Sequence, residues 1–383
     1  MKDGETVVPN LYVHFPFCRR KCDYCALYSV AGSSPERRAA HVSRAVESIS
    51  RLDARRLRTV YFGGGTPALC DLSPFRGLFP EEVEFTVEMH PLDVTDAKLD
   101  ELKSIGVNRI SLGVQSFCDS TLESMGRLHS SEQAVRAFRK IRASGFSNSG
   151  LDLIVGWPGD KGALDSVKRA VDLGAVHVSV YTLIVEPGTR LAARAAGEIA
   201  SEMPSDDAML DAISSIRDIL AEAGLSRYEV SNYARPGLEC RHNLAVWRGE
   251  DYLGIGPGAH SRVGRKRWRV ETGPESVGDC EWSRADETVL DAVADARERA
   301  LFALRLAEGI DLVHAENLLD PSSVDSGERQ KQVEVWKAEL DSWRLRLDGF
   351  TDLGLVRRLS STCYMLSNRG FEVCDAISAE LVS

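Results

Sequence analysis

The first half of the chain alternates short apolar runs with longer segments of helical spacing. β-branched and aromatic residues dominate six runs, which are therefore predicted strands: residues 11–15, 59–62, 84–88, 109–114, 151–155 and 177–183. The segments between them that predict helices are residues 34–52, 96–105, 131–144 and 163–173. Such alternation implies right-handed βαβ crossovers and a parallel sheet. Six units by residue 183 predict an α/β fold, a partial (β/α)6 TIM-like barrel.

The pattern loosens in the second half of the chain. A helix is predicted over residues 204–223, and a stretch rich in Gly, Pro and His follows at 252–261. From residue 286 onward the pattern is mostly helical, and residues 345–377 resemble a small winged-helix unit. We therefore predict a core barrel over 1–234 and a smaller, mainly helical, winged-helix-like C-terminal domain over 235–383.

The net charge of the chain argues against extended, non-specific binding of nucleic acid. The 383 residues contain 47 Lys and Arg against 57 Asp and Glu, a net charge of −10. The winged-helix-like tail from residue 341 carries five Arg against six Asp or Glu, whereas a DNA reader presents a basic face. Protein docking or a lid role is favoured for it. The acidic N-terminus and the lack of a long apolar run predict a cytoplasmic protein with no integral membrane segment.

Three of the nine cysteines crowd into eight positions directly after the first predicted strand. Cys18, Cys22 and Cys25 have the spacing C-x3-C-x2-C. Three thiolates on a short loop can ligate three irons of a cubane and leave the fourth iron open. Structural zinc is a weaker alternative, because no further ligand pair follows at standard spacing. Covalent haem attachment would need His at position 26, where the chain has Ala26.

This spacing, with Tyr24 before the last cysteine, resembles the radical S-adenosylmethionine (SAM) superfamily. The resemblance implies a [4Fe-4S] cluster whose open iron is chelated by SAM. Residues 63–67, Gly-Gly-Gly-Thr-Pro, end the second predicted strand, where the superfamily holds the methionyl ammonium. Glycines there let backbone atoms approach a ligand closely. Gly64, Gly65 and Thr66 are therefore expected at SAM.

The resemblance narrows to the oxygen-independent coproporphyrinogen III oxidase-like family, which includes haem chaperones. Residues that match its SAM pocket are Tyr12, Tyr24, Glu88, Gln115, Arg127 and Asp152. His90 departs from the family, which has Asn there. Each residue also has a plain structural interpretation, such as a strand aromatic or a helix cap. These residues follow one another at the ends of consecutive strands, where parallel α/β folds place their functional residues. This order favours a SAM pocket over a purely structural role.

Three features distinguish a haem chaperone from a coproporphyrinogen III dehydrogenase within this family. The dehydrogenase carries a further cysteine two residues after the cluster motif, where this chain has Leu27. It also has a longer segment ahead of the cluster than the seventeen residues here. Finally, residues 241–247, Arg-His-Asn-Leu-Ala-Val-Trp, resemble the H-N-x3-W signature of the chaperones, although Val246 stands where Tyr is usual.

His242 is the resulting candidate for a haem contact, because a neutral imidazole is a good axial ligand of iron. Cys240 and His260 are alternatives, and a purely structural histidine is the plain interpretation. The resemblance implies a haem chaperone with a [4Fe-4S] cluster and SAM, a haem-acceptor protein and a reductant as partners. The alternatives are the dehydrogenase, which decarboxylates propionates of a porphyrinogen, and a radical enzyme with an unrelated substrate.

Overall fold

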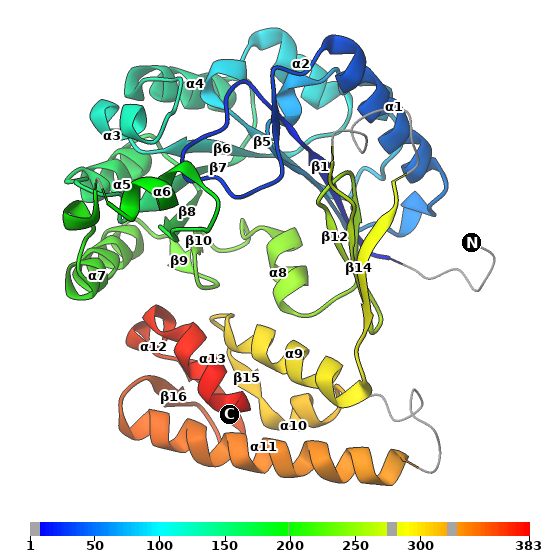
Figure 1. Ribbon diagram of the computed structural model, residues 1–383, viewed down its shortest axis with the longest axis vertical. Helices are drawn as coiled ribbons and strands as arrows, with labels where there is room; N and C mark the ends of the chain where they lie inside the picture. Colours follow the sequence, from blue (N-terminus) through cyan, green and yellow to red (C-terminus); the bar gives the residue numbers. More distant parts are fainter. Residues whose placement is uncertain (1–7, 198, 274–281, 320–327) are drawn as a thin grey trace.

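The computed structural model describes residues 8–197, 199–273, 282–319 and 328–383 (Figure 1). Six parallel strands stand side by side in chain order and confirm the predicted units. They are β1 (Asn10–Phe15), β4 (Thr59–Gly64), β5 (Glu84–Met89), β6 (Arg109–Gln115), β7 (Asn148–Val155) and β8 (His177–Thr182). A short parallel pair, β2 (Phe17–Cys18) and β3 (Val30–Ala31), flanks the cysteine loop.

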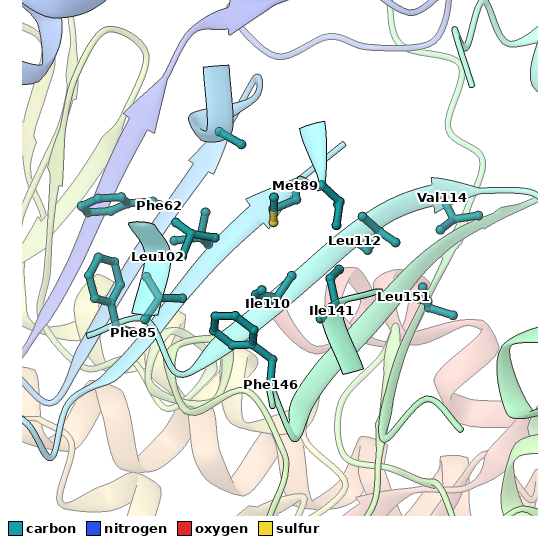
Figure 2. Close-up of a cluster of buried hydrophobic side chains, with 14 of the residues drawn as sticks. Phe62, Phe85, Met89, Leu102, Ile110, Leu112, Val114, Ile141, Phe146 and Leu151 are labelled. Carbon is teal, nitrogen blue, oxygen red and sulfur yellow. The ribbon is translucent and has the colours of Figure 1, made fainter. Parts of the chain in front are cut away.

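Helices cover the convex face of this sheet (Figure 1). They are α1 (Pro35–Ser50), α2 (Asp96–Ser104), α3 (Asp119–Ser124), α4 (Ser131–Ala143), α5 (Ala163–Asp172) and α7 (Asp206–Glu222). The short helix α6 (Arg190–Ala195) lies against the cysteine loop instead, where the Leu191 amide donates to the Asp23 carbonyl. Several start where a Ser or Thr side chain accepts from the first turn, and Ser130 forms a full capping box with Gln133. Between sheet and helices lies the main apolar core, which includes Phe62, Phe85 and Phe146 (Figure 2).

The sheet extends beyond the six predicted strands on both sides. β11 (Tyr252–Ile255) lies parallel to β1, and β12 (His260–Val263), β13 (Lys266–Val270) and β14 (Arg284–Val289) continue it antiparallel. On the other side, β10 (Asn232–Ala234) pairs with β8, and β9 (Ser226–Arg227) is the edge. Among the described strands β14 and β9 are the two edges, so the sheet is open rather than closed into a barrel.

The last quarter of the chain packs as a helical unit below the sheet (Figure 1). It comprises α9 (Ala292–Leu304), β15 (Ile310–Asp311), α10 (Leu312–Glu316), α11 (Arg329–Asp352), β16 (Val356–Arg358), β17 (Cys363–Leu366), α12 (Asn368–Glu372) and α13 (Cys374–Val382). Its own core is built around Trp336 and Trp343. The antiparallel β16–β17 pair after α11 supplies the wing. The sheet thus runs past residue 234, and the division into domains there stays a prediction.

A buried ionic cluster joins the sheet to this helical unit. The Asp295 carboxylate on α9 contacts three guanidinium groups, those of Arg262 at 2.8 Å, Arg267 at 3.1 Å and Arg299 at 3.0 Å. Buried charges are tolerated when they are paired and hydrogen-bonded in this way. Within the part of the chain that the structure describes, no helix has the length and apolar character needed to cross a membrane.

Candidate functional site

A cavity of about 500 Å³ opens at the carboxyl ends of the parallel strands. It brings together most of the residues that the sequence predicts for the cluster and for SAM: Cys18, Cys22, Cys25, Tyr24, Gly64, Gly65, Thr66, Glu88, Gln115, Arg127 and Asp152. Each parallel strand delivers its polar residues to the same edge, because all six run in the same direction. Tyr12 and His242 are the two predicted residues that do not line this cavity.

Cys18 ends β2, and Cys22 and Cys25 lie on the loop that leads from β2 to β3. The loop turns where the Cys25 amide donates to the Cys22 carbonyl at 3.3 Å. Burial and the two neighbouring thiols raise the pKa of Cys18 to about 11, while the Arg127 guanidinium acts in the opposite direction. Arg127 Nη1 donates to Cys22 Sγ at 3.5 Å. A cation at the thiols suits an anionic iron–sulfur cluster.

This donor set fits a cluster better than a single metal ion. In the described ranges, no three His, Cys, Asp or Glu side chains converge at the spacing of one metal ion. A cubane has a different requirement, because each thiolate ligates a separate iron atom. Tyr24 packs its ring edge against Trp157, with ring centroids 6.0 Å apart, and so closes one side of the cysteine loop.

The glycine segment after β4 forms a cradle beside the cysteine loop. A Cβ on Gly65 would lie 2.5 Å from the Phe17 carbonyl oxygen and 3.0 Å from Cys18 Sγ. Gly64 has φ of +102°, a conformation that L side chains rarely adopt. The Gly65 and Thr66 amides donate to the Phe15 and Phe17 carbonyls, which fixes the segment against β1 and β2. The glycine backbone therefore lies directly beside Cys18 Sγ on the cavity wall, where a side chain would not fit.

Two carboxyl groups lie at the floor of the cavity. Glu88 accepts from the Tyr61 hydroxyl at 2.8 Å and from the Gly64 amide at 3.1 Å. Burial and the nearby Asp152 raise the pKa of Glu88 to about 7. Asp152 accepts from the Ser111 hydroxyl at 3.0 Å, and burial raises its pKa above the usual range. Such groups can accept from ribose hydroxyls or balance a sulfonium charge.

Gln115 occupies a strained position on the cavity wall. Its φ is +73°, in the left-handed region, where residues other than glycine are uncommon. The register between β6 and β7 shifts between Gly113 and Gln115, which marks a bulge. Arg127 Nη2 donates to the Gly113 carbonyl and fixes that bulge. Bulges and strained backbone of this kind re-aim side chains at functional sites.

Tyr12 and His242 lie on the concave side of the sheet, outside the cavity lining. The Tyr12 hydroxyl pairs with His14 Nδ1 at 3.0 Å, and the Tyr12 ring centroid is 6.5 Å from that of His242. His242 is 6% exposed, on α8 (Arg241–Trp247), which occupies the concave side of the sheet (Figure 1). Its Nδ1 lies 2.8 Å from Thr59 Oγ1. Burial and then Arg109 lower the pKa of His242 to about 3. Its haem-ligand role stays a prediction.

Glu84 of β5 anchors the N-terminus of α8 to the sheet. Its carboxylate accepts from the amides of Arg241 and His242, each at 3.0 Å. An anion at a helix N-terminus satisfies amides that have no partner within the helix. Glu84 and Glu88 therefore belong to the same inward face of β5, one at each end.

The sequence interpretation missed the residues that support the carboxyl groups. Tyr61 and Ser111 donate to Glu88 and Asp152, and Tyr181 lines the cavity at the end of β8. The available signal was the two-residue alternation of polar side chains within the strands, as in Thr59 and Tyr61. This alternation places polar groups on one face of each strand.

Comparisons with known proteins agree with this geometry. Residues 12–174 match the Radical SAM superfamily. The chain is 36% identical over 325 residues to the "heme chaperone HemW" of Mycobacterium tuberculosis, covering 79% of this chain and 83% of that protein. It is 34% identical to the protein of the same name from Lactococcus lactis, covering 81% and 85%.

The fold also matches a solved structure. Coproporphyrinogen III oxidase (HemN) from Escherichia coli, a radical SAM enzyme, superposes with a TM-score of 0.77 at 21% identity, over 98% of this chain and 90% of that one. At this identity the likeness shows the fold. The family relationship rests on the sequence relatives. The chain belongs to the HemW family of the radical SAM superfamily, whose cofactors are a [4Fe-4S] cluster and SAM.

Proposed function

We propose that this protein is a haem chaperone, which binds haem and transfers it to an acceptor protein. The single observation that carries the proposal is the 36% identity to a heme chaperone HemW over 79% of the chain. Position 27 supports it: Leu27 lies at the cavity mouth and is 52% exposed, where the dehydrogenase has a further cysteine. The site of transfer is the cytoplasm, and a reductant serves the cluster.

The residues of the cavity divide into three roles in this proposal. Cys18, Cys22 and Cys25 hold the [4Fe-4S] cluster, and Arg127 offsets its negative charge. The residues that hold SAM are Tyr24, Gly64, Gly65, Thr66, Glu88, Gln115, Arg127 and Asp152, which line the cavity, together with Tyr12, which lies outside its lining. When bound, cluster and SAM supply one-electron cleavage of the sulfonium bond.

Haem titration of the reconstituted protein tests the proposal. Haemin added under anaerobic conditions to the full chain, loaded with cluster and SAM, should give a saturable Soret band at a stoichiometry near one. Transfer to an apo-haem protein should follow when the loaded chaperone and the acceptor are mixed. A wild-type protein with intact cluster that binds no haem would contradict the proposal.

The fold likeness to HemN makes a dehydrogenase the specific alternative. Coproporphyrinogen III, SAM and a reductant are incubated anaerobically with the reconstituted protein. The chaperone proposal predicts no accumulation of the decarboxylated porphyrinogen. Formation of that product in stoichiometric or greater amounts would establish the dehydrogenase instead.

A further inference from the structure

Four neighbouring strands each carry a buried polar atom that has no hydrogen-bond partner among the described residues. These atoms are Thr86 Oγ1 on β5, Arg109 Nε on β6, Asn148 Oδ1 on β7 and His177 Nδ1 on β8. We call these four residues the concave row. Buried polar atoms in folded proteins are nearly always hydrogen-bonded, to protein, water or an ion. Four unpartnered atoms on adjacent strands therefore indicate that a further group binds there.

The strand registers bring the concave row together on one face of the sheet. Arg109 is opposite Thr86 on one side and Asn148 on the other, and His177 lies on the next strand, one pleat further along. Register partners on neighbouring strands share a face and lie about 5 Å apart. Ile110, the next residue after Arg109, points into the apolar core on the convex side (Figure 2). The concave row therefore faces the other side, which α8 occupies (Figure 1).

Arg109 carries a buried positive charge that no described carboxylate pairs. Its side chain is 1% exposed, and it makes no ion pair with any residue that the structure describes. Glu84, an inward carboxylate of β5, binds the first amides of α8 instead. An unpaired buried charge is strongly unfavourable, whereas a paired and hydrogen-bonded one is tolerated. Water can satisfy the hydrogen bonds but not the charge, so the partner that Arg109 requires is an anion.

The charge of Arg109 acts on groups beside it and above it. Burial and then Arg109 lower the pKa of His242, on α8, to about 3. Arg109 also opposes the burial that raises the pKa of Glu88 to about 7 and the pKa of Asp152 above its usual range. An anion on Arg109 therefore influences both α8 and the floor of the cofactor cavity.

We propose that a small anion, a halide or a simple carboxylate, binds the Arg109 guanidinium between the concave row and α8. The Thr86 hydroxyl, the Asn148 amide group and the His177 imidazole can each donate a hydrogen bond to it. The anion is small, because Thr86, Arg109 and His177 are at most 1% exposed. This site is separate from the cofactor cavity, whose lining includes none of the four residues, and it does not depend on the proposed haem function.

Bromide diffraction gives the direct test. Crystals of the cluster-loaded full chain are soaked in sodium bromide, and data are collected at the bromine absorption edge. The wild type should show an anomalous peak in contact with the Arg109 guanidinium, and Arg109→Met should show none there. Peaks at exposed arginines alone would mean an adventitious ion only and would overturn the proposal. The wild-type crystals decide this even where Arg109→Met does not fold.

Thermal unfolding in solution gives the second test. The melting temperature of the cluster-loaded full chain is measured in sodium bromide, in sodium formate and in sodium gluconate, whose anion is bulky, at the same ionic strength. Bromide or formate should raise the melting temperature of the wild type over gluconate in a saturable way, by about 2 °C or more. Formate without bromide would identify the ligand as a carboxylate.

Two variants separate binding at Arg109 from a general effect of salt. Arg109→Met removes the charge and keeps an unbranched apolar side chain, so the difference between small and bulky anions should disappear. The matched control is Arg139→Met, because Arg139 is exposed on α4, and its response should equal that of the wild type. An equal response in Arg109→Met and wild type would contradict the proposal.

Discussion

The Tyr61 hydroxyl donates a 2.8 Å hydrogen bond to Glu88 Oε1, and so a tyrosine of β4 fixes the carboxyl group that faces the cavity from β5. The Gly64 amide holds the other carboxylate oxygen at 3.1 Å. Because both donors favour the ionised form, they oppose the burial and the Asp152 charge that raise the pKa of Glu88 to about 7. The carboxyl group therefore titrates in the physiological range.

Replacement of Tyr61 by Phe should move this titration to higher pH. The variant removes one donor to the carboxylate, so the pKa of Glu88 rises further above 7. SAM affinity, which we expect to rise as Glu88 ionises, should then increase at higher pH than in the wild type. SAM titrations of the cluster-loaded protein between about pH 6 and 9 measure the shift.

The control for this prediction is Tyr233→Phe. Its hydroxyl accepts from Arg227 Nε at 2.8 Å and lies outside the cavity lining. That variant should keep the wild-type pH profile. An identical profile in Tyr61→Phe and wild type would show that Glu88 does not govern SAM affinity.

Glu88→Gln should stabilise the cofactor-free protein while weakening its binding of SAM. The folded-state pKa of Glu88, about 7, lies above its ordinary value of 4.5, so its contribution to stability is full below pH 4.5 and is lost as pH rises through 7. The Gln side chain is neutral at every pH and avoids this loss. At pH 8 the free energy of unfolding of the variant should therefore exceed that of the wild type by about 1–2 kcal/mol, a value reduced for solvent screening at the cavity. Denaturant unfolding below pH 4.5 and at pH 8 measures it, and the gain should vanish below pH 4.5. Lower stability of Glu88→Gln at pH 8 would contradict the pKa assignment.

Cys22→Ser should abolish most of the iron–sulfur cluster. The variant removes one of three thiolates and leaves Arg127 Nη1 without its sulfur partner. Iron and sulfide analysis after anaerobic reconstitution measures the loss. Cys363→Ser, on β17, is the matched control and should retain the wild-type content. Retention of about four irons per chain by Cys22→Ser would refute the ligand assignment.

Gly65→Ala should weaken the binding of SAM to the cluster-loaded protein. The added methyl group would meet two carbonyl oxygens, those of Phe17 and Phe15, at 2.5 and 2.8 Å, and Cys18 Sγ at 3.0 Å. The segment must move, and the cysteine loop with it. Reconstituted protein should lose SAM affinity by about tenfold or more. Gly273→Ala, where a Cβ meets nothing within 4 Å, is the control.

The sequence predicted the parts of this molecule that depend on local pattern. Six strand–helix units, the cysteine loop and the residues at strand ends all follow from periodicity and motif, because chain order and spatial order coincide in βαβ units. β11 was not predictable in this way, since it pairs with β1 across about 240 residues. The placement of α8 depends on Glu84 accepting its first amides, a contact between distant segments.

The position of His242 shows the same limit at the level of a single residue. A histidine in a family-like motif favours a ligand role, but its surroundings come from β1 and β4 as well as α8. Motif matching assigns a residue type to a position, whereas burial and partners are set by the packing of elements far apart in the chain. The cysteines were predictable because Cys18, Cys22 and Cys25 lie within eight consecutive residues, so their proximity does not depend on distant segments.

Glu84 and Glu88 stand on the same face of β5, four residues apart, or about 13 Å along the strand. The Glu84 carboxylate binds the N-terminus of α8, a helix that packs against the C-terminal unit, whereas Glu88 faces the cofactor cavity. A central strand bonded on both sides cannot yield independently of its neighbours. β5 therefore holds the anchor of α8 and the carboxyl group of the cofactor cavity at a fixed separation, as parts of one hydrogen-bonded strand.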